Sequence, residues 1–158
     1  MVIQSSSWSD TTFHVAGFCF DVVPAFRYLG VTLDAGGSPA RMVQDVATRA
    51  SAALYRLCEY VGTLGWRTPW TRLVLYDVYV RTVLLFAAPV WAPGGLQSSF
   101  PEEPPLLRPL GVLYRRGLRL LVDVPIDTRT SVLYTVTCRP PLSLPMGKAV
   151  WRYYLRLR

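Results

Sequence analysis

The stretch FRYLGVTLD, residues 26–34, is the segment around which we predict the rest of the chain to be organised. Its side chains alternate in the way that a half-buried β-strand requires. A glycine inside a strand is typical either of a β-bulge or of a close approach by another backbone, and both interpretations stay open here. One face of the strand carries Leu29, Val31 and Leu33 and is the predicted core face. The other face carries Tyr28, Gly30 and Thr32, an aromatic and two small residues, and is predicted to form an open shelf.

Two short β-rich runs precede this stretch, at residues 12–16 and 18–23, with Gly17 between them. Their β-branched and aromatic side chains predict an antiparallel pair of strands. Pro24 then turns the chain into the next strand. Residues 1–37 are therefore predicted to form a small antiparallel β unit.

The remaining residues, 38–158, show the periodicity of α-helices. Ser38-Pro39 and Thr68-Pro69 are each typical of a helix start, because a hydroxyl N-cap precedes a proline in the first turn. The predicted helices cover about residues 38–61, 70–88, 106–122, 127–136 and 146–157. The chain is thus predicted to be mainly α-helical, a compact helical bundle behind a small N-terminal antiparallel hairpin or sheet.

The predicted helix at residues 70–88 is apolar on nearly every side, so we expect it to be central and covered on several sides. Asp77 and Arg81, near its middle, are spaced to pair with each other, and Pro89 is expected to stop the helix. Residues 73–92 also approach the length of a membrane span, but each of the two charges would cost about 2.5–3.5 kcal/mol at a bilayer centre. A buried helix is therefore favoured over a membrane span.

The positive charge of the chain is concentrated in its last third. The formal net charge is +7, yet residues 1–103 hold seven basic and eight acidic residues, whereas residues 104–158 hold ten basic and two acidic ones. Such a one-sided basic field suits a polyanion, nucleic acid first and an anionic membrane or acidic protein second, although a plain solvated face is the alternative. The candidate phosphate-binding residues are Arg108, Arg115, Arg116, Arg119, Lys148, Arg152 and Arg156.

Several kinds of catalytic and metal site are not indicated by the sequence. Cys19, Cys58 and Cys138 are far apart and odd in number, so neither a zinc site nor a disulfide framework is predicted. His14 is the single histidine and lies in an apolar run, which favours a packed or surface imidazole over a catalytic one. The N-terminal segment lacks the pattern of a secretory signal, so we expect an intracellular protein, nuclear or cytoplasmic.

The order of these motifs resembles the C-terminal part of the reverse transcriptases of non-LTR (LINE-type, jockey-like) retrotransposons. In that family the palm ends in a β-hairpin with an aromatic–Leu–Gly signature, which is similar to FRYLGVTLD. Phe86-Ala87 and Cys138 stand where the family has Tyr-Gly and Gly. The resemblance covers about residues 13–157, and its downstream segments are VLLFAAPVW (83–91), LYRRGLRLLVDVP (113–125) and CRPPL (138–142).

The resemblance implies nucleic-acid binding by a palm hairpin and a thumb-like helical region. It implies that Phe26, Tyr28, Leu29 and Gly30 match the primer grip, which holds the 3′ end of the primer, and that thumb helices contact phosphates of the template–primer duplex. The parent family is an RNA-directed DNA polymerase whose palm aspartates hold two Mg²⁺ ions. This sequence has no Asp-Asp pair. We therefore expect no catalytic residue, no metal site, and neither polymerase nor endonuclease activity in this chain.

Three other interpretations stay open. The same fold could serve as a structural or scaffold subunit, with a protein partner covering the apolar helix at residues 70–88. It could belong to a membrane-associated protein that uses residues 73–92. The reading frame could also be the remnant of a decayed element. The sequence does not indicate which nucleic acid is preferred or what the oligomeric state is.

Overall fold

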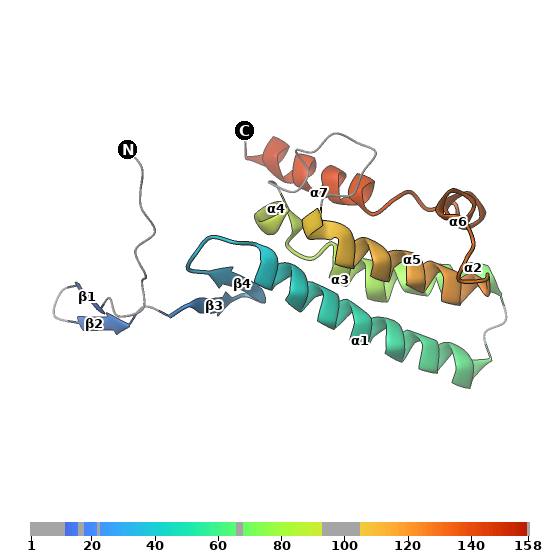
Figure 1. Cartoon of the computed structure of the whole chain (residues 1–158), viewed down its shortest axis with the longest axis horizontal. Helices are drawn as coiled ribbons and strands as arrows, with labels where there is room; N and C mark the ends of the chain where they lie inside the picture. Colours follow the sequence, from blue (N-terminus) through green and yellow to red (C-terminus); the bar gives the residue numbers. More distant parts are fainter. Residues whose placement is uncertain (1–11, 16–17, 22, 66–67, 93–104, 158) are drawn as a thin grey trace.

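The computed structural model describes residues 12–15, 18–21, 23–65, 68–92 and 105–157. The fold is mainly α-helical, with two separate two-stranded antiparallel sheets at its N-terminal end (Figure 1). The predicted fold class, a mainly helical chain behind a small antiparallel β unit, is therefore confirmed. Residues 1–11 and 93–104 lie outside the described residues.

The strands pair as hairpins. In the first hairpin, Val15 lies opposite Phe18, as predicted for the two β-rich runs. In the second, Tyr28 lies opposite Val31. The prediction of one strand through residues 26–34 is therefore wrong, whereas a hairpin is what the family resemblance implies for this stretch. The strands are β1 (Thr12–Val15), β2 (Phe18–Asp21), β3 (Ala25–Tyr28) and β4 (Val31–Asp34).

The turn between β3 and β4 consists of Leu29 and Gly30, and both have positive φ, 48° and 84°. Two-residue hairpin turns favour this conformation because its twist matches that of the flanking strands. A residue with a Cβ pays about 1–2 kcal/mol to adopt it. The predicted core face is also wrong: Leu29 is 80% exposed, Leu33 is exposed, and only Val31 packs partly against the core.

The long helix α1 (Ala40–Leu64) begins just after the predicted start. The Ala40 N–H donates a hydrogen bond to the Ser38 hydroxyl (3.3 Å), and Gly65, with a φ of 62°, ends the helix. The predicted apolar stripe is confirmed. Its buried residues are Met42, Val43, Val46, Ala50, Leu54 and Leu57.

The predicted helix at residues 70–88 is present but is not continuous. A π-helical turn interrupts it, and Ala87, with a φ of 51°, breaks it before Pro89. Pro89 lies in the first turn of the next helix, where a proline lacks no intrahelical hydrogen bond, so it does not stop a helix as predicted. In chain order the segments are α2 (Pro69–Tyr76), η1 (Asp77–Arg81), α3 (Thr82–Leu84) and α4 (Ala88–Trp91).

This run from Pro69 to Trp91 is buried on one side only. The outer side leaves Trp70, Val74 and Val78 exposed, Trp70 to 64%. The prediction that the helix is covered on several sides is therefore wrong within the described part of the chain. The inner, buried side chains are Leu73, Tyr76, Val80, Leu84, Ala88 and Trp91.

The remaining helices lie within a few residues of their predicted ranges. The α1 helix, the α2–η1–α3 run and α5 pack on one another as a bundle, while α6 packs on α5 and α7 on α4 (Figure 1). The elements are η3 (Pro105–Leu107), α5 (Arg108–Val122), α6 (Thr130–Thr137) and α7 (Ser143–Arg156). The predicted inward stripe of α5 is buried at Leu110, Tyr114, Gly117, Leu118 and Leu121 and half-buried at Leu113.

Two buried tyrosines connect the helices of the bundle. The Tyr76 hydroxyl donates to the backbone carbonyl of Tyr114 (3.1 Å), and the Tyr114 hydroxyl donates to the carbonyl of Pro140 (3.1 Å). Burial raises the pKa of Tyr114 to about 12 and also raises the pKa of Tyr76. Both hydroxyls therefore remain neutral donors at physiological pH.

Asp77, in the π-helical turn, binds two arginines. Its carboxylate lies 3.3 Å from Nη1 of Arg81, which confirms the predicted pair, and 2.6 Å from Nη2 of Arg139. The Arg139 guanidinium also lies over the ring of Trp70, 5.7 Å from its centroid. The segment after α6 is thereby joined to the π-helical turn.

Candidate nucleic-acid interface

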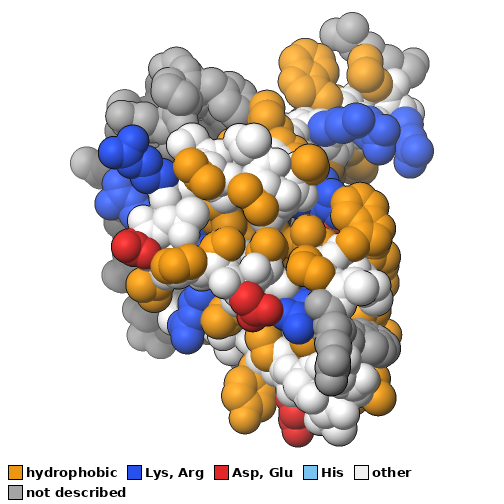
Figure 2. All heavy atoms as spheres, turned by 90° about the vertical axis from the view of Figure 1, so that its right-hand side faces the viewer, with side chains coloured by type: hydrophobic (Ala, Val, Ile, Leu, Met, Phe, Trp, Pro, Cys, Tyr) orange, Lys and Arg blue, Asp and Glu red, His pale blue; other side chains and the backbone are white. Residues whose placement is uncertain are grey.

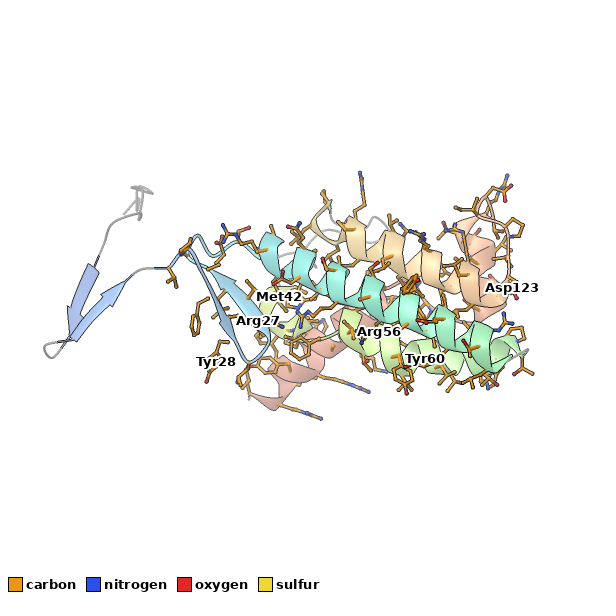
Figure 3. All side chains as sticks on the ribbon, turned by 90° about the horizontal axis from the view of Figure 1, so that it is seen from below. Arg27, Tyr28, Met42, Arg56, Tyr60 and Asp123 are labelled. Atoms are coloured by element: carbon orange, nitrogen blue, oxygen red, sulfur yellow. The ribbon has the colours of Figure 1, made fainter. Side chains whose placement is uncertain are left out.

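The β3–β4 hairpin presents large apolar side chains to solvent. Phe26, Tyr28 and Leu29 are all exposed, and Figure 3 shows Tyr28 pointing away from the helices. Three of the four residues that match the primer grip are therefore accessible to a ligand. Tyr28 and Leu29 lie at the turn of the hairpin, and Phe26 lies two residues earlier on β3, opposite Leu33.

Gly30, the fourth of these residues, is covered by the helical body. A Cβ at this position would lie 3.2 Å from Cζ of Phe86 and 3.9 Å from Nη1 of Arg49. The predicted close approach is therefore present, but the neighbour is a side chain and not a backbone. The Arg49 guanidinium lies over the Phe86 ring, 5.4 Å from its centroid, in cation–π geometry. These contacts seat the hairpin turn on the helices.

Polar contacts hold β4 against the start of α1. The Thr32 hydroxyl donates to the carboxylate of Asp45, and the Thr32 N–H points at the sulfur of Met42 (3.3 Å). Asp34, at the end of β4, pairs with Arg41 (3.6 Å). The hairpin is therefore positioned from two sides, by α1 and by Phe86.

The predicted phosphate-binding residues fall into three groups in the structure. Arg115 is half-buried. Arg119 donates from Nη2 to the carbonyl of Thr128 (2.9 Å), so it holds the segment between α5 and α6. The exposed members are Arg108, Arg116, Lys148, Arg152 and Arg156.

Three described aspartates form ion pairs with arginines that were not predicted to bind phosphate. Asp34 pairs with Arg41, Asp123 pairs with Arg72 (2.6 Å), and Asp77 takes its two partners in the bundle. None of these arginines is among the predicted phosphate-binding residues. Within the described residues, no ion pair neutralises the five exposed cations of α5 and α7.

These five cations lie on two elements that have different neighbours. The α5 helix packs against α1, α2 and α6, whereas α7 packs against α4. Figures 1 and 3 both show α7 apart from α5. The structure therefore divides the cations into two groups. Arg108 and Arg116 lie on α5, and Lys148, Arg152 and Arg156 lie on α7.

Several residues of these surfaces were missed by the sequence analysis. Arg49 meets Phe86 and Gly30 only through tertiary packing, so no spacing rule could have found it. Arg56 and Tyr60, one turn apart on α1, line a groove, and their spacing is a local signal that was available.

The described cysteines and acidic residues form no candidate metal centre. No group of three His, Cys, Asp or Glu side chains is close enough to hold a metal among the described residues. Cys58 and Cys138 are free thiols, and burial raises the pKa of Cys58. The side chains of His14 and Cys19 lie outside the described residues.

No protein-family model matches this sequence, no curated protein matches it, and no solved structure matches its fold. The resemblance to non-LTR reverse transcriptases therefore stays a prediction that rests on the quoted motifs.

Proposed function

We propose that this chain is a non-catalytic nucleic-acid-binding module that corresponds to the end of the palm and the thumb of a non-LTR reverse transcriptase. The supporting observation is the set of five exposed cations on α5 and α7, which no ion pair within the described residues neutralises. Cations of this kind contact phosphates without reading sequence. The ligand would be a DNA duplex or an RNA–DNA hybrid.

The β3–β4 hairpin supplies contacts of a different chemistry. Phe26 and Tyr28 are exposed aromatic side chains on a hairpin that Phe86 and Arg49 hold in place. Aromatic rings stack on bases at a duplex end or in a single strand. In this proposal the helical cations bind the backbone of the duplex, and the hairpin turn contacts its terminal nucleotide.

The salt dependence of binding tests the proposal. Fluorescence anisotropy of a labelled duplex should give a dissociation constant whose logarithm rises linearly with the logarithm of salt concentration, by about 0.9 per neutralised phosphate. Replacing Arg152 and Arg156 together by Gln should lower that slope by about 2. Arg41→Gln removes the same kind of charge from a residue already paired with Asp34 and should leave the slope unchanged. A flat salt titration would contradict the proposal.

A second candidate function is that of a structural subunit, and the exposed outer side of the Pro69–Trp91 run favours it. Figure 2 views the end of the bundle and shows hydrophobic side chains spread over it between a few charged ones. By length and composition this run is also the one helix within the described residues that could cross a membrane, with a mean hydropathy of 1.6 and 28% of its most apolar window buried. The ion pairs of Asp77 on the same run favour a protein neighbour over lipid.

Two measurements separate these cases. A structural subunit should be recovered with one protein partner in fixed stoichiometry, and replacing Trp70 and Val78 by Ser should release that partner. A membrane protein should stay in the pellet on carbonate extraction. Recovery of the chain without a partner, in the carbonate supernatant, would count against both.

A further inference from the structure

A groove separates α1 from the α2–η1 run, with a volume of about 420 Å³. On the α1 side, the lining residues Arg56 and Tyr60 are four positions apart and therefore share one face of the helix. Figure 3 shows them one turn apart where α1 borders that run. Leu57 and Leu75 contribute apolar walls from the two helices. The residues that line it include Ala53, Arg56, Leu57, Tyr60, Leu75 and Tyr79.

Two tyrosines stand on opposite sides of this groove. Tyr60 belongs to α1 and is 61% exposed, and Tyr79 belongs to the π-helical turn and is 59% exposed. Each combines an accessible ring with an apolar neighbourhood. Nucleobases stack on such a ring whatever their identity, because every base has a π-face. π-Helical turns are often found at functional sites.

The groove also carries a positive charge and no negative one. Arg56 is exposed at its edge, and no described acidic side chain forms an ion pair with it. No acidic residue is among those that line the groove. A guanidinium beside exposed aromatic rings is the combination that binds a phosphate together with its base.

We propose that this groove binds one or two unpaired nucleotides, with bases stacked on Tyr60 and Tyr79 and a phosphate on Arg56. The inference rests on the proposed function and extends it to single-stranded nucleic acid, at a site distinct from the cations of α5 and α7. The apolar walls would also accept a helix of a protein partner. The two exposed rings and the lining arginine favour the nucleotide, because a helix–helix contact needs neither.

Binding of a labelled oligothymidylate of about 10 nucleotides, compared with binding of a duplex, tests this site. Tyr60→Leu and Tyr79→Leu keep the apolar walls but remove the rings, so each should weaken single-strand binding about fivefold or more and leave duplex binding unchanged. Tyr60→Phe should retain single-strand binding, because stacking does not need the hydroxyl. Arg56→Gln should lower the single-strand salt slope by about 0.7.

The chain offers a matched control on the same helix. Tyr55 is 75% exposed on α1 but does not line this groove, so Tyr55→Leu should leave single-strand binding unchanged. Single-strand affinity that survives both Leu substitutions in the groove would overturn the inference, as would no binding of the oligothymidylate by the unmodified chain. Equal losses for duplex and single strand would also overturn it. Failure of the proposed function is distinguishable, because it appears as a flat duplex titration in the unmodified chain.

Discussion

Gly117 of α5 and Tyr76 of α2 are in direct contact: a Cβ at position 117 would lie 2.6 Å from Cε2 of Tyr76. The ring has nowhere to move, because Tyr76 is fully buried and its hydroxyl is bonded to the Tyr114 carbonyl. The close approach of α2 and α5 therefore depends on the missing side chain at position 117.

Gly117→Ala should lower the free energy of unfolding by about 1–3 kcal/mol, because the added methyl group overpacks the core. Gly147 of α7 is the matched control, since a Cβ there meets no atom within 4 Å. Gly147→Ala should raise the free energy of unfolding by about 0.5–1 kcal/mol through helix propensity alone. Urea denaturation measures both, and equal effects at the two positions would contradict the contact.

Asp77→Asn should destabilise the fold by about 1–3 kcal/mol, because it leaves two partly buried arginines without their anion. Arg81 and Arg139 retain only 26% and 14% side-chain exposure in these pairs. Asp123→Asn removes an ion pair whose carboxylate is 71% exposed, and its partner Arg72, though 17% exposed, keeps the Leu121 carbonyl as an acceptor (3.4 Å). This variant should therefore change the stability by less than about 1 kcal/mol. Thermal denaturation of the two variants side by side checks the ranking.

Gly30→Ala should be more destabilising than Gly37→Ala. Both glycines have positive φ, 84° and 66°, so both substitutions introduce backbone strain. Only at position 30 would the new Cβ also press on Phe86, at 3.2 Å; at position 37 it meets nothing within 4 Å. The difference between the two unfolding free energies measures the contact between hairpin and helices, and a difference of zero would mean that Phe86 moves aside freely.

Leu29→Asn should separate the stability of the hairpin from its binding role. Asparagine adopts the left-handed conformation at lower cost than leucine, so the variant should be as stable as the parent or more stable. If the exposed Leu29 side chain contacts nucleic acid as proposed, the same variant should bind a duplex end more weakly. A variant that gains stability and keeps full affinity would remove Leu29 from the interface.

Tyrosine ionisation should weaken the fold at high pH. The pKa of Tyr114 is raised from its usual value of about 10 to about 12, so below pH 10 both folded and unfolded states keep the proton. Between pH 10 and 12 only the unfolded state loses it, and the free energy of unfolding should fall by up to about 1.4 kcal/mol per pH unit for this group. Urea denaturation across this range should show a shallower fall for Tyr114→Phe than for the parent chain, and an equal fall in both would contradict the prediction.

The helical part of the fold could be predicted because its signals are local. The buried stripes of α1 and α5 follow from apolar residues at three- and four-residue spacing, and the pair of Asp77 with Arg81 follows from i,i+4 geometry. Exposed cations on α5 and α7 follow in the same way. Spacing could not distinguish Arg119, which has a structural role, from the exposed arginines of α5. Its partner is the backbone carbonyl of Thr128, which lies in another segment.

Other features could not be predicted because they depend on residues distant in sequence or on unusual backbone conformations. Leu29 and Ala87 both have positive φ, which their side chains disfavour, so neither residue type indicated the turn or the break before α4 that it forms. Periodicity identified the Pro69–Trp91 run as apolar but could not say which sides its neighbours cover. The contact of Gly30 with Phe86 and Arg49 joins three segments and needed the tertiary structure.

The π-helical turn at Asp77–Arg81 sets the rotational phase between the two halves of its run. A π-helical turn holds about one residue more than an α-helical turn, and one residue corresponds to about 100° of rotation about the helix axis. Deleting a single residue inside the turn would make it α-helical and keep Leu84 facing the core. Deleting one residue from α2, outside the turn, would instead rotate Leu84 away from the core and Phe86 away from Gly30. The contact between Gly30 and Phe86, which holds the hairpin turn, therefore depends on the rotational phase of the Pro69–Trp91 run. Single-residue insertions and deletions in this run, outside the π-helical turn, should therefore change the packing of the hairpin turn against Phe86.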